Sequence, residues 1–141
     1  MIVLDTDHVN VLKYPDQPQF ATLTNRLNAS ADQDVATTVI TVEEQMRGWL
    51  ALINRSDNVR RQVPAYTELL RLLDFFSRWQ VISFHEQAAD TFQRLRQQRI
   101  RIGTMDLKIA AIALVHEALL LSANLRDFQR VPDLRVADWI N

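Results

Sequence analysis

Hydrophobic positions along the chain alternate between short apolar runs and longer stretches with helical spacing. Short runs of apolar or β-branched residues bounded by polar segments are typical of buried strands. We expect five such strands, at residues 2–4, 35–40, 81–84, 118–122 and 134–136. Between them, apolar residues recur three or four positions apart, which predicts helices at residues 6–13, 18–28, 41–53, 64–79, 85–98 and 104–115.

Residues suited to capping indicate where several of these helices begin. Thr6 is expected to cap the first helix, and Thr104 to cap the helix with the most apolar body. Thr41 and Glu44 have the spacing of a capping box, in which the glutamate side chain reaches back to the threonine backbone amide. Pro64 suits the first position of a helix.

Strands that alternate with helices predict an α/β fold. We expect a three-layer α/β/α arrangement in which a mostly parallel sheet of four to five strands is covered on both faces. The length of 141 residues predicts one domain, residues 1–141. In such sheets, ligands bind in the crevice beyond the carboxyl ends of the strands.

Composition narrows the class of protein. Hydrophobic residues make up 48% and charged residues 23% of the chain, which is typical of a globular protein. The absence of cysteine excludes disulfides, thiolate metal sites and cysteine nucleophiles. Without a signal peptide or an apolar stretch long enough to span a bilayer, we expect a soluble, cytoplasmic protein with no membrane partner. The net charge of −1 argues against tight non-specific binding to nucleic acid, but a local basic surface remains open.

Acidic residues stand where these elements begin or end. Asp5 follows the first strand, Glu44 opens the helix after the second, Asp106 lies in the first turn of a helix, and Asn124 and Asp127 follow the strand at 118–122. Carboxylates that converge at one sheet edge suit a hard cation such as Mg²⁺. Each residue also has a structural interpretation, as a turn residue, a capping residue, a favourable charge in a first helical turn or a solvated loop acid.

Two other functions remain open at this point. Asp5 and Asp7 after a first strand resemble the start of haloacid-dehalogenase-type phosphatases, in which Asp5 would be the nucleophile. Those enzymes need a downstream lysine and a later acidic pair, whereas Lys108 lies inside a helix and no such pair follows. The third hypothesis is a non-catalytic binding module whose acids only cap helices.

Four segments in order carry a family resemblance: Met1–Thr6, Glu44–Gly48, Gly103–Ala111 and Asn124–Trp139. The chain resembles PIN-domain ribonucleases of the VapC type, the toxins of type II toxin–antitoxin pairs. The resemblance implies a PIN-like fold and a Mg²⁺-dependent endoribonuclease, with Mn²⁺ as a substitute, that cleaves RNA such as tRNA or ribosomal RNA loops. It also implies a homodimer and a cognate antitoxin whose C-terminal segment covers the acidic groove.

The same resemblance assigns roles to the acidic residues. Asp5 and Asp106 correspond to the principal Mg²⁺ ligands. Glu44 corresponds to the third catalytic acid and is preferred over Glu43, because the family places its glutamate four residues before the glycine, here Gly48. The fourth polar position falls at Asn124, which is aspartate in some relatives, or at Asp127.

The remaining expectations concern substrate binding and histidine. Thr6, Thr104, Arg99, Arg101 and Lys108 are expected to contact the RNA backbone. The three histidines lack the spacing of metal ligands and are expected to be ordinary helix residues, although the family usually has a small or apolar residue where this chain has a histidine, at position 8.

Overall fold

The computed structural model describes all residues, 1–141. Its centre is a five-stranded sheet in the order β3-β2-β1-β4-β5, and every pair of neighbouring strands is parallel. The strands are β1 (Ile2–Leu4), β2 (Val35–Thr38), β3 (Val81–Ile82), β4 (Leu119–Leu121) and β5 (Arg135–Ala137). The predicted α/β class, with a parallel sheet of four to five strands, is confirmed.

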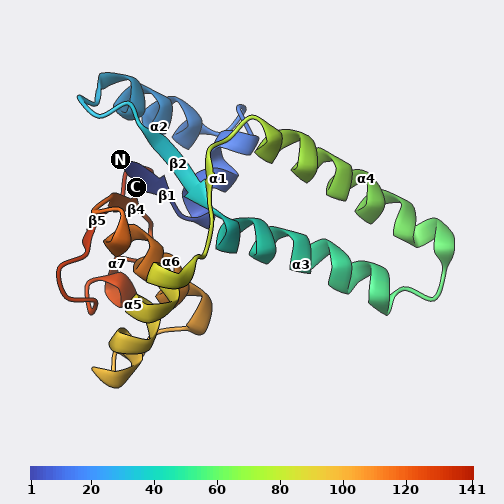
Figure 1. Ribbon diagram of the computed structural model, residues 1–141. Helices are drawn as coiled ribbons and strands as arrows, with labels where there is room; N and C mark the ends of the chain where they lie inside the picture. Colours follow the sequence, from blue (N-terminus) through green and yellow to red (C-terminus); the bar gives the residue numbers. More distant parts are fainter.

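Seven helices connect and cover these strands. They are α1 (Thr6–Lys13), α2 (Pro18–Ala29), α3 (Val39–Arg55), α4 (Val59–Ser77), α5 (Glu86–Gln97), α6 (Thr104–Val115) and α7 (Leu125–Phe128). Figure 1 shows α5, α6 and α7 grouped together, while α3 and α4 form a hairpin that extends away from the sheet. No helix combines the length and the apolar character that a membrane span requires.

Alternation along the strands gives the sheet two apolar faces. Val3, Ala36 and Leu120 belong to one core cluster, which the side chains of α5, α6 and α7 complete. Ile2, Leu4 and Leu121 point to the other face and pack with residues of α1, α2 and α4. Because successive strand residues face opposite sides, both faces need helices, and three layers result.

The order of the strands determines where a site can form. The chain places β2 and β3 on one side of β1 and then returns through α5 and α6 to place β4 on the other side. The carboxyl ends of β1 and β4 therefore diverge at a topological switch point, which is where open α/β sheets bind ligands. Leu4 pairs with Leu121, so Asp5 and Ser122 leave the sheet side by side.

Three predicted helix caps are wrong, although α1 and α6 begin at the predicted residues. Asp5, not Thr6, is the N-cap of α1, because its carboxylate accepts a hydrogen bond from the Thr6 backbone amide. Thr38 caps α3 by accepting from the Thr41 backbone amide, so α3 begins earlier than the predicted capping box. Thr104 is the first residue of α6 rather than its cap.

The same early start of α3 shortens β2. The β-branched run predicted a strand to Ile40, but the strand ends at Thr38 since the threonine side chain starts the helix there. Similarly, α4 begins at Val59 behind the Asn58 cap, and Pro64 lies inside the helix. Pro64 is exposed, so the carbonyl that loses its hydrogen-bond donor lies near solvent.

Candidate active site

Asp5 lies at the edge of the sheet formed by the carboxyl ends of the strands, where β1 and β4 diverge. It lies between β1 and α1 and is only 6% exposed. Its Oδ1 atom accepts a hydrogen bond from the Thr6 backbone amide at 2.7 Å, and its Oδ2 atom accepts from the Ser122 hydroxyl at 2.7 Å. The pairing of β1 with β4 thus joins residues that are 117 positions apart in the sequence.

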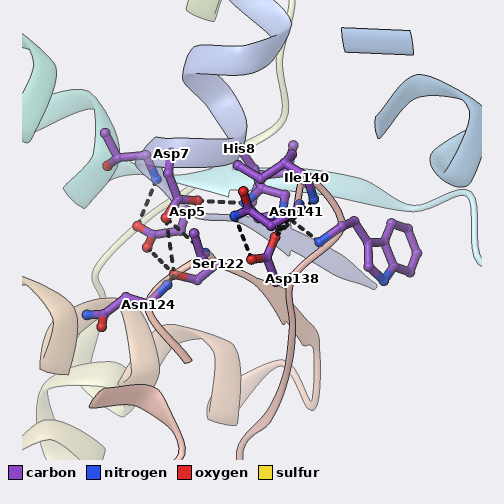
Figure 2. Close-up of polar contacts among 12 residues, drawn as sticks. Asp5, Asp7, His8, Ser122, Asn124, Asp138, Ile140 and Asn141 are labelled. Carbon is purple, nitrogen blue, oxygen red and sulfur yellow. Dashed lines mark hydrogen bonds and ion pairs between the residues drawn. The ribbon is translucent and has the colours of Figure 1, made fainter. Parts of the chain in front are cut away.

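Asp7 joins Asp5 at this edge, as Figure 2 shows. Its Oδ2 atom accepts hydrogen bonds from the Ala123 backbone amide at 2.9 Å and from the Ser122 hydroxyl at 3.4 Å. Sequence reasoning did not assign Asp7 or Ser122 to the metal site. Their positions, two residues after Asp5 and directly after the strand that pairs with β1, were the available signal.

Asn124 connects the two remaining predicted acids. Its side-chain Nδ2 donates to Asp106 Oδ2 and to Asp127 Oδ2, both at 3.2 Å. Asp106 comes from the first turn of α6 and Asp127 from α7, a short helix where the sequence predicted only a loop. The structure therefore places both Asn124 and Asp127 beside Asp106.

Glu44 reaches the site from α3. Its Oε2 atom accepts a hydrogen bond from the Thr6 hydroxyl at 3.1 Å, so it does not return to the Thr41 amide as a capping box requires. Its Oε1 atom is buried and has no hydrogen-bond partner. An unpaired buried carboxylate oxygen is costly, and it indicates a place for a donor or a cation.

Burial and mutual repulsion disfavour the charged forms of these acids. Burial, with repulsion from Asp7 and Asp106, raises the pKa of Asp5 from its ordinary value of 3.8 to about 7, against the opposing hydrogen bonds. Burial and repulsion from Asp106 also raise the pKa of Glu44. Burial raises the pKa of Asp106, with further contributions from Asp127 and Asp7. The carboxylates therefore share one electrostatic field, which a cation would neutralise.

The donor set fits a hard divalent cation. Every side chain gathered around Asp5 and Asp106 offers oxygen or amide groups, and the chain has no thiolate. No three acidic or histidine side chains converge closely enough to enclose an ion by themselves. Mg²⁺ does not require this, because it keeps several waters and is usually held by one or two carboxylates together with substrate phosphate.

Substrate-binding predictions divide into two groups. Arg99, Arg101 and Thr104 line a cavity of about 600 Å³ whose wall also includes Asp127. Lys108 is not among the residues that line this cavity, and its ammonium group lies 5.9 Å from the centre of the Phe84 ring. Thr6 is close to the acids, where it orients Glu44.

His8 has a specific buried role that its sequence position did not reveal. The side chain is fully buried, its Nδ1 atom lies 2.6 Å from Asp7 Oδ1, and its Nε2 atom accepts from the Trp139 backbone amide at 3.1 Å. Since a backbone amide can only donate, Nε2 carries no proton and Nδ1 donates to Asp7. Both ring nitrogens are occupied, as Figure 2 shows, so His8 is not available as a metal ligand.

Comparison with known proteins identifies the family. The family model described as the PIN domain matches residues 2–134. The chain belongs to the PIN domain family. Within the family it is similar to VapC proteins, as its sequence segments indicate. Ribonuclease VapC1 of Haemophilus influenzae strain R2866 is 32% identical over 100 residues, which is 71% of this chain and 70% of the relative.

Two further relatives extend the comparison. Ribonuclease VapC1 of Rickettsia felis is 34% identical over 85 residues, 57% of this chain. The match spans only 60% of that relative's length. The solved structure of VapBC-1 from nontypeable Haemophilus influenzae superposes with a TM-score of 0.71 at 26% identity, covering 100% of both chains. The chain therefore has the PIN fold.

Proposed function

We propose that this PIN domain is a Mg²⁺-dependent endoribonuclease and the toxin of a type II toxin–antitoxin pair. The observation that supports it most is the convergence of Asp5, Glu44 and Asp106 on the switch point between β1 and β4. The relatives named Ribonuclease VapC1 support the reaction class. As substrate we propose exposed loops of tRNA or ribosomal RNA, because protein recognition of RNA favours unstacked, single-stranded bases.

The chain's own residues have distinct tasks in this proposal. Asp5 and Asp106 hold the cation, with Mn²⁺ as a substitute for Mg²⁺. Ser122 and the Thr6 amide fix the two oxygens of Asp5, and Asn124 fixes Asp106 beside Asp127. A bound divalent cation supplies positive charge that offsets the charge developing on a phosphodiester during hydrolysis.

Glu44 is the proposed general base. The Thr6 hydroxyl holds one of its oxygens, while the other has no partner and is available to accept a proton from an attacking water. Burial raises its pKa, which makes Glu44 a better proton acceptor than an exposed glutamate. Asn124 also donates a hydrogen bond to Asp127, which joins Asp5, Glu44 and Asp106 in what we call the acidic edge.

The test compares purified protein and single variants on structured RNA with Mg²⁺ and with chelator. We expect cleavage only with the metal, and a loss on the order of 100-fold or more in Asp106→Asn. Asp90→Asn is the matched control, since Asp90 is an exposed acid on α5. Cleavage that persists in both chelator and Asp106→Asn would contradict the proposal.

The structure gives less support to the two alternatives. An aspartyl-phosphate phosphatase needs a lysine near its nucleophile, whereas the Lys108 ammonium lies against Phe84. A non-catalytic module whose acids only cap helices agrees with Asp5, which is an N-cap, but not with Glu44, whose carboxylate caps nothing. Release of phosphate from a small ester, without RNA cleavage, would favour the phosphatase.

We further propose an antitoxin as the protein partner, by analogy with the VapBC-1 structure. A cavity of about 420 Å³ lies along α3, with four apolar residues, Val39, Val42, Met46 and Leu50, among its six lining residues. Glu43, the neighbour of Glu44 along α3, also lines this cavity, so an apolar segment seated there would lie on the helix that carries Glu44. Met46→Glu is expected to reduce capture of the protein encoded beside the toxin, while leaving RNA cleavage intact.

A homodimer is the remaining proposal about assembly. Five exposed apolar residues of α4 recur at alternating spacings of four and three: Val59, Val63, Tyr66, Leu70 and Leu73. This is the spacing at which helices pack against each other. Antiparallel pairing of two α4 helices would bring the basic first turn, with Arg60 and Arg61, toward Asp74 of the second copy.

A further inference from the structure

The cavity beside the acidic edge is basic. Three of its nine lining residues are arginines, Arg96, Arg99 and Arg101, and Asp127 is its single acidic one. No carboxylate forms an ion pair with any of these three guanidinium groups. By contrast, Arg71 on α4 pairs with Glu68. The cavity therefore offers unpaired positive charge next to the proposed cleavage site.

The connection from α5 to α6 is built to display these arginines. Ile100 and Ile102 are partly buried and pack against the core cluster beneath the sheet, whereas Arg99 and Arg101 are exposed. Burial of the two isoleucines anchors this connection and leaves the arginine side chains on its solvent side. The Arg130 side chain also donates to the Arg101 carbonyl at 3.2 Å, which fixes the backbone there.

Arg99 occupies a position that favours glycine. Its φ angle is 61°, in the left-handed region, where it ends α5. Its amide donates to the Arg96 carbonyl at 2.9 Å, and the next amide, of Ile100, donates to the Leu95 carbonyl at 3.2 Å. Helices that end in this way usually have glycine at the left-handed residue. Strain at a residue that lines a cavity points to a role for its side chain.

We propose that this cavity binds a backbone phosphate of the RNA substrate, one that neighbours the phosphodiester being cleaved. This inference rests on the proposed nuclease function and adds a second contact to it. Guanidinium groups bind phosphate through two parallel hydrogen bonds. The first turn of α6 borders the same cavity at Thr104, and no side chain caps this helix, so its free amides favour an anion.

Geometry favours RNA over an acidic protein segment as the occupant. Asp127 belongs both to the cavity wall and to the cluster that Asn124 holds around Asp106. An RNA strand whose cleaved phosphodiester lies at the acidic edge, beside the bound cation, can therefore place a neighbouring phosphate in the cavity lined by the arginines. An acidic segment of a protein partner is the competing occupant, and the experiment distinguishes the two.

The primary measurement is binding of a fluorescein-labelled, single-stranded RNA 12-mer by anisotropy in EDTA, where no metal-dependent cleavage occurs. Arg99→Gln and Arg101→Gln are each expected to weaken binding about 10-fold. Each is also expected to reduce the slope of log K against log salt by about 0.7, the value for one phosphate contact on a single strand. Arg94→Gln is the matched control, because Arg94 is exposed on α5 and does not line the cavity.

A glycine variant separates a binding role from a structural one. Arg99→Gly relieves the left-handed backbone, so Tm is expected to rise by about 2–4 °C while RNA binding weakens. A purely structural role for Arg99 predicts the opposite sign for Tm. Methylphosphonate substitution, one phosphate at a time, is expected to weaken binding at one position in the unmodified protein, and to weaken it less at that position in Arg99→Gln.

Several results would overturn the proposal. Unchanged RNA binding in both glutamine variants would do so, as would a methylphosphonate series without a sensitive position. Retained RNA binding with lost binding of the acidic protein partner would assign the cavity to that partner instead. If the protein binds RNA through these arginines but never cleaves it with Mg²⁺, the nuclease proposal fails and the phosphate site stands.

Discussion

Asp5 is the residue where burial and charge conflict most. Its carboxyl group is only 6% exposed and lies within the field of Asp7 and Asp106, which is why its pKa rises to about 7. A carboxyl whose pKa is higher in the folded than in the unfolded state loses stability as it ionises. The free energy of unfolding in metal-free buffer therefore falls as pH rises from about 4 to about 7.

Asp5→Asn tests this conflict. The amide can still accept from the Thr6 amide and donate to Ser122, but it carries no charge. We expect the variant to be more stable than the unmodified protein at pH 8, by on the order of 3 kcal/mol, with a smaller gain at pH 5. Urea unfolding without metal at both pH values measures the difference. A variant that is less stable at pH 8 would show that the ionised carboxylate is not repelled.

His8 offers a second prediction at this scale. Its ring accepts from the Trp139 amide and donates to Asp7, so His8→Leu leaves a partly buried donor and a partly buried acceptor without these partners. We expect a loss of about 2–3 kcal/mol in the free energy of unfolding. The ¹⁵N spectrum of the imidazole should show the proton on Nδ1, and a proton on Nε2 would contradict the hydrogen-bond assignment.

At the scale of elements, short apolar or β-branched runs predicted all five strands, because the central strands β1, β2 and β4 are buried under helices on both faces of the sheet. Helix ends were predicted less well. Thr38 and Asp5 compete with equally good capping residues nearby, and only the tertiary position of β1 and β2 decides between them. The α7 helix, four residues long, lies below the length that periodicity can detect.

In the candidate site too, some residues were predicted from the sequence and others were found only in the structure. Asp5, Glu44 and Asp106 were predicted from element edges and family segments, and the structure brings them together. Asp7 was noted only for the phosphatase alternative, and Ser122 became visible only through the register of β1 with β4, which no local pattern contains. Lys108 follows Asp106 by two residues on α6, and that spacing turns its side chain to another side of the helix.

The exposed apolar row on α4 leads to a prediction about assembly. Leu70, the fourth of the five residues in this row, is 69% exposed. We expect Leu70→Glu to shift a dimer toward monomer in sedimentation experiments, because each introduced carboxylate would be buried against the apolar row of the other helix. Asp90→Asn is the control, because Asp90 is exposed on α5. Arg71→Glu would not serve, since it breaks the ion pair with Glu68. Unchanged sedimentation would exclude this face from self-association.

At the scale of the whole molecule, metal binding and folding share the same carboxylates. Mg²⁺ competes with the proton on Asp5, so its apparent dissociation constant is expected to be roughly 30-fold weaker at pH 5.5 than at pH 8. The increase in Tm on adding Mg²⁺ should therefore be larger at pH 8. Calorimetric titration at the two pH values checks this, and equal affinities would contradict a role for Asp5 as a ligand.

The pairing of β1 with β4 also sets a time at which activity can begin. Asp5 is made well before its partner Ser122, which is 117 residues further along the chain. A ribosome-bound chain that has exposed only β1, β2 and β3 has no neighbour for the far side of β1. The proposed nuclease therefore cannot assemble its acidic edge before β4 has been made, so the translating ribosome is not exposed to an active enzyme until β4 and α7 have emerged.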